Sequence, residues 1–275
     1  MASFVEQLSS AKGKVLWLDY TDYAGKLLAG GAVPWLDVGA LVAWQRKAQG
    51  LLKSDVVALP LAPLCAAWLK KNPALAAAMA EKKRAPYPLK TLLADAPLRA
   101  HIAELLAGLR ASFAGVTLAL VIPSPRQWVA LAYAQAHGGA EVEAGADETD
   151  TAAMYLADFL RAFGESGVDV LLLEESERSE PASSDELEWY RPVLNVAAHY
   201  RWVAGLRLPL AKHGVGGIDF IIAPRKLNGA HAGIALAPDF WKGAAAEGGD
   251  GFRYAVIPAD AKPETVLDRL AVLRK

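Results

Sequence analysis

The 275-residue sequence contains one cysteine, no long apolar run and almost no net charge. Because Cys65 has no second cysteine, an internal disulfide and a multi-cysteine zinc site are excluded, which suits a reducing compartment. A net charge of −1 gives no broad basic surface, so we expect no nucleic-acid partner. No apolar run approaches the roughly 18 residues that a membrane span needs. A signal peptide is also lacking, and we expect a soluble, cytoplasmic protein.

The sequence also lacks a glycine-rich turn after its first apolar segment, where it has "LDYTDYAGK". That absence disfavours an open, doubly wound sheet. Eight short apolar segments, most followed by a segment of helical periodicity, instead predict an α/β fold. We expect a single (β/α)8 barrel over residues 1–275, with a peripheral helix at 1–13. The strands are expected at 14–20, 55–63, 116–125, 168–175, 206–214, 217–224, 232–239 and 252–260, with helices at 39–52, 183–205 and 262–275 among those between and after them.

Three segments, at 93–134, 154–176 and 189–214, resemble the superfamily of uroporphyrinogen decarboxylase and cobalamin-independent methionine synthase. The first resembles a helix that leads into a strand ending in a proline-containing substrate loop. The second is similar to the family's Gly-Val-Asp before a strand that ends in an acid, and the third to its long helix before a strand ending in His and Gly. The resemblance implies a barrel and a lyase or methyltransferase activity on a small molecule. It also implies a homodimer, because related barrels often pair.

This chain lacks two sequence motifs of that superfamily, which reduces the number of activities to expect. The porphyrinogen decarboxylases carry an arginine-rich segment after the first strand, where this chain has Asp19 and Asp22, whose charges would repel a polycarboxylate. The zinc methyltransferases carry a His-x-Cys after the fifth strand, where this chain has His213 and Val215. Porphyrinogen decarboxylation and thiolate-zinc chemistry are therefore not expected.

Catalytic residues of a barrel sit at the C-terminal ends of its strands, which selects the candidate residues. Adjacent strand residues point opposite ways, so at most one of Glu174 and Glu175 faces the mouth directly, and the sequence does not decide which. A carboxylate beside an apolar mouth has a raised pKa that suits acid/base work, whereas a solvated strand end is the alternative. His213 could shuttle a proton, hold a divalent metal together with Glu174, or be purely structural.

The other candidates would hold and orient the substrate. Arg126 and Arg225 could bind a carboxylate, and aromatic side chains could wall an aromatic substrate, although aromatics at helical spacing more often belong to a core. Lys212 could form a Schiff base, and an exposed lysine is the alternative. We expect His213, Glu174, Glu175 and Tyr20 to be catalytic, and Asp19, Tyr23, Ser124, Arg126, Trp128, Lys212, Arg225, Asp239 and Trp241 to bind the substrate.

These residues predict a C–C bond lyase, decarboxylase-type or aldehyde-eliminating, that works on a small or aromatic substrate by acid/base catalysis. No organic cofactor is expected, and a divalent metal is an open alternative. A methyltransferase linked to a corrinoid or folate partner shares the fold and remains a second hypothesis. A barrel without activity that serves as a binding or scaffold subunit is a third, because both family motifs are missing.

Overall fold

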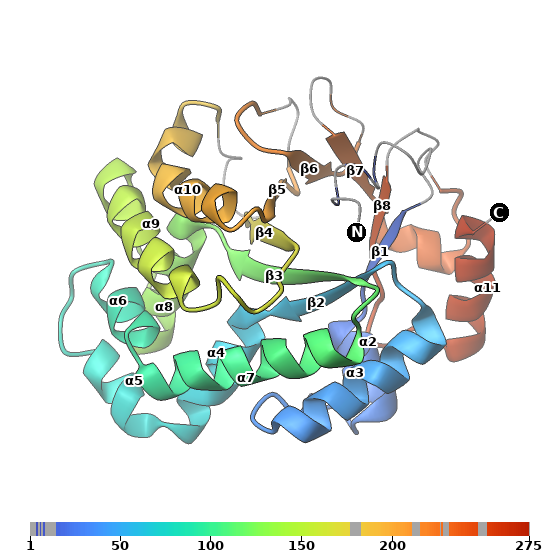
Figure 1. Ribbon diagram of the computed structural model, residues 1–275, viewed down its shortest axis with the longest axis horizontal. Coiled ribbons are helices and arrows are strands. Elements are labelled where there is room, and N and C mark those ends of the chain that lie inside the picture. The colour runs from blue at the N-terminus through green and yellow to red at the C-terminus, as the bar shows by residue number, and fades with distance from the viewer. Residues whose placement is uncertain are drawn as a thin grey trace.

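The eight apolar segments form the strands of one sheet, which curls into a nearly closed barrel surrounded by helices (Figure 1). The computed structural model describes residues 4, 6, 8, 15–176, 183–210, 215–225, 227, 231–246 and 252–274. Every pair of neighbouring strands in the sheet is parallel, and the order runs β1-β8-β7-β6-β5-β4-β3-β2. The predicted (β/α)8 barrel is confirmed. Its strands are β1 (Leu16–Asp19), β2 (Val56–Pro60), β3 (Thr117–Pro123), β4 (Val170–Glu174), β5 (Val203–Arg207), β6 (Phe220–Ala223), β7 (His231–Ala235) and β8 (Phe252–Val256).

The barrel has a seam between β1 and β2, which form no ladder with each other although both are described in full. Two side chains bridge the seam at its lower end. Asp55 accepts a hydrogen bond from the backbone nitrogen of Leu16 at 2.7 Å, and the Ser54 hydroxyl accepts one from Leu18 at 3.0 Å. These contacts satisfy backbone groups that a neighbouring strand would otherwise pair.

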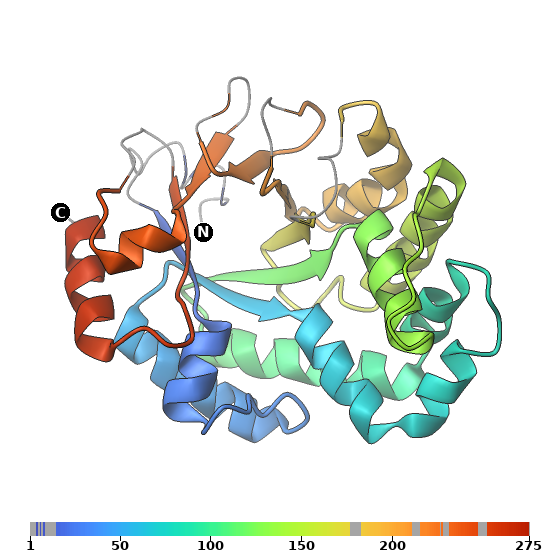
Figure 2. The same ribbon diagram turned by 180° about the vertical axis from the view of Figure 1, so that it is seen from behind.

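The helices cover the barrel unevenly, as the two opposite views show (Figures 1 and 2). The described residues between β5 and β7 form no helix, so that side of the barrel is thinly covered. No helix of the described residues is long and apolar enough to cross a membrane. The helices are α2 (Thr21–Leu28), α3 (Val38–Leu52), α4 (Leu61–Lys71), α5 (Pro73–Met79), α6 (Tyr87–Leu93), α7 (Ala96–Ser112), α8 (Pro125–Ala136), α9 (Ala146–Arg161), α10 (Arg191–His199) and α11 (Pro263–Leu273), with short 3-10 helices η1 (Glu186–Tyr190) and η2 (Pro238–Lys242).

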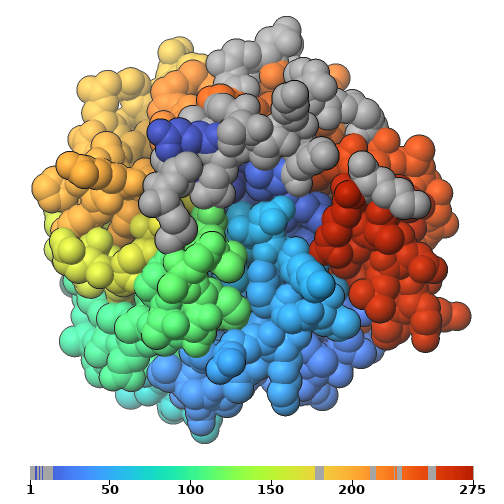
Figure 3. Space-filling view, turned by 45° about the vertical axis from the view of Figure 1, so that its right-hand side comes forward, coloured from blue at the N-terminus to red at the C-terminus, as the bar shows by residue number. Residues whose placement is uncertain are grey.

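The C-terminal helix contacts the first third of the chain on one side of the barrel. In Figure 3 the surface of α11 borders that of the first third of the chain. There Arg274 donates hydrogen bonds to the carbonyl oxygens of Leu52 and Lys53. These bonds and the β1–β8 ladder tie the last βα unit to the first.

Alternation along the strands gives the barrel two separate cores. The outer core lies between the sheet and the helices, and the smaller inner core fills the barrel. Phe4 lies at the lower end of the inner core, with its ring 5.4 Å from that of Phe220 and 5.9 Å from that of Phe252. Phe4 is only 2% exposed, so this residue of the expected 1–13 helix lies against the barrel interior.

Gly205 in β5 has no side chain, and the ring of Phe220 occupies the space beside it inside the barrel. A Cβ atom at Gly205 would lie 2.0 Å from the ring of Phe220, which is fully buried. We expect Gly205→Ala to lower the free energy of unfolding by about 1–3 kcal/mol, because an overpacked core must shift. Gly216→Ala is the matched control, since a Cβ there meets nothing within 4 Å. Urea denaturation measures both variants, and equal losses would contradict the packing argument.

Several strand bounds differ from the prediction; β7 and β8, for example, end at Ala235 and Val256 rather than at residues 239 and 260. The fifth strand was expected at 206–214, but β5 occupies Val203–Arg207, and the expected helix at 183–205 ends at His199. Arg201 has a left-handed backbone (φ 59°) that stops the helix, and Pro209 follows the strand. The second strand ends at Pro60 rather than at residue 63, because α4 starts at Leu61.

Candidate active site at the barrel mouth

Strand parity places Glu174 inside the mouth and Glu175 outside it. Val170 and Leu172 belong to the inner core, and Glu174 follows them at the same spacing of two. The same alternation brings Arg207 inward at the end of β5, where it is the register partner of Glu174. The question that the sequence left open is thereby answered.

Glu174 and Arg207 form an ion pair at the floor of the mouth. The Glu174 Oε1 and Arg207 Nη1 atoms lie 3.3 Å apart, and their side chains are 29% and 21% exposed. The pKa of Glu174 is raised to about 7, because burial raises it, the charge of Arg207 lowers it less, and the negative charge of Asp19 adds to the rise. Close to neutral pH the Glu174 carboxyl group therefore exists in both protonation states, which suits a residue that transfers protons.

Asp19 and Tyr254 complete the polar floor from β1 and β8. Burial raises the pKa of Tyr254 well above its usual value, and the negative charges of Asp19 and Glu174 add to the effect. The Tyr254 hydroxyl thus keeps its proton and can donate a hydrogen bond. Its ring also supports the Arg207 guanidinium, whose central carbon lies 5.4 Å from the ring centre.

A cavity of about 660 Å³ opens beside this floor, over the ends of β5 to β8. That volume is in the usual range for small-molecule sites. Of the described residues that line it, Arg207 and Asp239 carry charge, Tyr254 a hydroxyl group, and the others are apolar. The apolar wall includes Leu210, Ile222, Ile234, Leu236, Phe240 and Val256.

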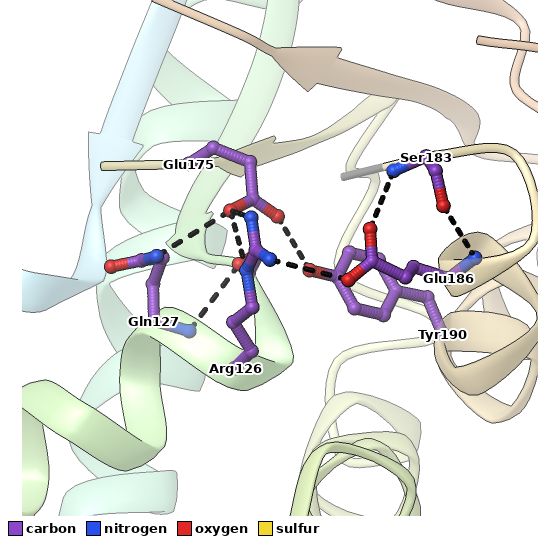
Figure 4. Close-up of polar contacts among 7 residues, drawn as sticks. Arg126, Gln127, Glu175, Ser183, Glu186 and Tyr190 are labelled. Atoms are coloured by element: carbon purple, nitrogen blue, oxygen red, sulfur yellow. Dashed lines mark hydrogen bonds and ion pairs between the residues drawn. The ribbon is translucent and has the colours of Figure 1, made fainter. Parts of the chain in front are cut away.

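Glu175 lies instead in a polar cluster behind the barrel wall (Figure 4). Arg126 donates two hydrogen bonds to Glu175 Oε2, at 3.1 and 2.9 Å, and the Tyr190 hydroxyl donates one to Oε1 at 2.5 Å. Arg126 also lies 3.5 Å from a carboxylate oxygen of Glu186. Because Glu175 is 4% exposed, this cluster is not part of the mouth; its contacts hold the end of β4, α8 and η1 together.

The structure brings only some of the predicted residues to the mouth. Glu174, Asp19 and the exposed Asp239 lie there, and Arg225 is exposed after β6. His213 and Lys212 lie outside the described residues. Within the part of the chain that is described, no three His, Cys, Asp or Glu side chains are grouped to hold a metal ion. The remaining candidates do not line the mouth cavity: Tyr20, Tyr23, Ser124, Trp128, Glu175 and Trp241 are buried, and Arg126 is partly buried.

Three of the four aromatic candidates have a structural contact that explains their position. The Tyr20 hydroxyl accepts a hydrogen bond from Gln45 at 3.1 Å, beneath α3. The Trp128 ring meets that of Phe159 edge-on at 6.2 Å, and Trp241 donates to the carbonyl oxygen of Val256 at 2.8 Å. These side chains belong to the layer between sheet and helices, where large aromatic side chains bury most area.

Sequence reasoning missed Arg207 and Tyr254. With the fifth strand expected at 206–214, Arg207 fell near its beginning, whereas in the structure it ends β5. The signal was a single arginine within the apolar run "VAGLRLPL", because a charge inside a buried strand needs a reason.

No known family model matches this chain, and no curated protein is significantly similar to it.

Proposed function

We propose that this chain is a barrel enzyme of the lyase class, a decarboxylase that acts on a small organic acid by acid/base catalysis. The observation that carries the proposal is Glu174, a carboxyl group with a pKa of about 7 that contacts Arg207 beside an apolar cavity. A proton donor matched to neutral pH next to a carboxylate-binding cation is what such a reaction requires. The single buried Cys65 supports a cytoplasmic location.

In the proposed reaction, Glu174 protonates the carbon atom that carries the substrate's carboxylate. The bond between that carbon and the carboxylate breaks, its electron pair stays on the carbon and takes the proton, and carbon dioxide leaves. Glu174 then recovers a proton from water, which reaches it because its side chain is partly exposed. The net change replaces a carboxylate and one proton by a C–H bond and carbon dioxide.

Arg207 stabilises the charge as it moves. Before the reaction the negative charge is on the substrate, and after proton transfer it is on Glu174, 3.3 Å from the guanidinium. One fixed cation can serve both positions, so the site needs little rearrangement when the charge shifts. Tyr254 holds the guanidinium from below.

Release of carbon dioxide from a panel of hydroxybenzoates, phenylacetates and short aliphatic acids tests the proposal. Val256→Trp is expected to abolish release, because Val256 lines the cavity, is 43% exposed and can accept a larger side chain without disturbing the core. Leu267→Trp is the matched control, since Leu267 is 44% exposed on α11, outside the cavity. Release that is equal in both variants would place the reaction elsewhere, and a wild-type protein that releases none from the panel would favour an inactive binding barrel.

A further inference from the structure

We infer that the mouth selects acids with a single carboxylate on an apolar body, with Arg207 binding that carboxylate and Asp239 at the rim rejecting a second one. The inference rests on the proposed function, because it names the substrate class of the same site. It concerns binding, however, and can therefore be tested without any turnover.

Arg207 provides the selection for a carboxylate. It is the one cationic side chain among the described residues that line the cavity, and 21% of its side chain remains exposed there. A guanidinium presents paired N–H donors that match a carboxylate. Its ion pair with Glu174, at 3.3 Å, is longer than a strong charge-assisted hydrogen bond, and protonation of Glu174 weakens the competition for Arg207.

The walls provide the selection for an apolar body. Beyond Arg207 the cavity is lined on several sides by aliphatic and aromatic carbon, from Ile222 in β6 and Ile234 in β7 to Phe240 in η2. A ring or branched chain that extends from the bound carboxylate would replace water on these surfaces. Removing such apolar area from water favours the complex.

The acidic side chains around the mouth provide the rejection of polyanions. Glu174 pairs with Arg207 at the floor, Asp19 lies near Glu174 and Tyr254, and the exposed Asp239 is among the residues that line the cavity. Among the described groups, the mouth thus holds three carboxylates and one guanidinium. One ligand carboxylate can pair with Arg207, but a second at the far end of the ligand would meet Asp239.

Four small probes of similar shape separate these contributions. Benzoate carries one negative charge, benzamide none, benzylammonium one positive charge, and terephthalate a second carboxylate opposite the first. We expect benzoate to bind the wild-type protein at least about tenfold more tightly than benzamide, since a charge-assisted hydrogen bond contributes about 1.5–3 kcal/mol. Ligand-observed NMR at pH 6.5 and low salt measures all four. Tighter binding of benzylammonium than of benzoate would overturn the inference.

Three variants assign the selectivity to residues. Arg207→Gln is expected to remove the preference for benzoate over benzamide, whereas Arg161→Gln, which removes an exposed charge at the end of α9, is expected to keep it. Asp239→Asn is expected to tighten terephthalate about two- to fivefold and to change benzoate binding much less, because an exposed charge acts weakly. The effect of Asp239→Asn should shrink at high salt.

The outcomes separate the inference from the proposed function. Preference for benzoate that depends on Arg207, without release of carbon dioxide from any acid, would support the inference and overturn the decarboxylase. Release of carbon dioxide from acids that bind no better than their amides would overturn the inference alone. If Arg207→Gln does not fold, the affinities of the wild-type protein for benzoate, benzamide and benzylammonium still show whether the mouth prefers a carboxylate.

Discussion

Glu174→Gln is expected to lower the turnover of the proposed decarboxylation by about 10²–10⁴-fold, the range in which a general acid contributes. An amide has the size of the protonated carboxyl group but gives up no proton at neutral pH. Steady-state release of carbon dioxide measures the loss. Glu104→Gln is the matched control, because Glu104 is exposed on α7. A variant at position 174 that turns over as fast as the control would remove Glu174 from the reaction.

The same substitution is expected to stabilise the fold at alkaline pH. The pKa of Glu174 in the folded protein is about 7, above the ordinary value of 4.5, because burial disfavours the charged form. The folded state therefore holds this proton more tightly than the unfolded chain does. The resulting stabilisation is fully present below pH 4.5 and is lost as the pH rises through 7.

Above pH 7 the folded protein carries a partly buried negative charge that the glutamine variant lacks. We expect Glu174→Gln to raise the free energy of unfolding at pH 9 by about 1–3 kcal/mol, a range that allows for the solvent contact of the side chain. At pH 5 the wild-type and variant proteins should be nearly equal. Urea denaturation at the two pH values measures the difference, and a gain of the same size at both would contradict the raised pKa.

The barrel could be predicted from the sequence because its signal is repeated. Eight apolar segments, most with helices between them, indicate one architecture even when single boundaries are wrong, as at β5. The orientation of each strand could not be predicted, because a barrel strand is buried on both faces. Leu171, Leu172 and Leu173 are all fully buried, so their pattern contains no alternation that would orient Glu174 and Glu175.

The positions of some candidate residues could be predicted from the sequence, and those of others could not. The rule that strand ends meet at the mouth correctly brought Asp19, Glu174 and Asp239 toward it. It also selected Arg126 and Tyr20, which follow their strands by one to three residues but turn toward the helices. Which way a side chain turns after a strand depends on tertiary partners such as Glu175, and those partners lie far away in the sequence.

The neighbouring substitution, Glu175→Gln, is expected to have the opposite effect and to destabilise the fold by about 3–5 kcal/mol, as breaking a buried ion pair does. It removes the carboxylate that accepts from Arg126 and Tyr190. Glu186, which is 28% exposed and 3.5 Å from Arg126, neutralises that guanidinium less well. Urea denaturation at pH 7 and at pH 9 measures the loss.

A double variant shows whether that loss comes from the charge left behind in the cluster around Glu175. Replacing both partners, as in Glu175→Gln with Arg126→Met, should recover part of the stability, because no buried charge then lacks its opposite. If the double variant is as unstable as the sum of the two single ones, the ion pair is not what Glu175 contributes.

Glu174 and Glu175 are adjacent and chemically identical, so opposite signs of ΔΔG at alkaline pH can come only from the faces of the strand that they occupy. If Glu175→Gln lowers the free energy of unfolding and Glu174→Gln raises it, Glu175 has a structural role. Glu174 is then a group that is kept in the mouth although it destabilises the fold.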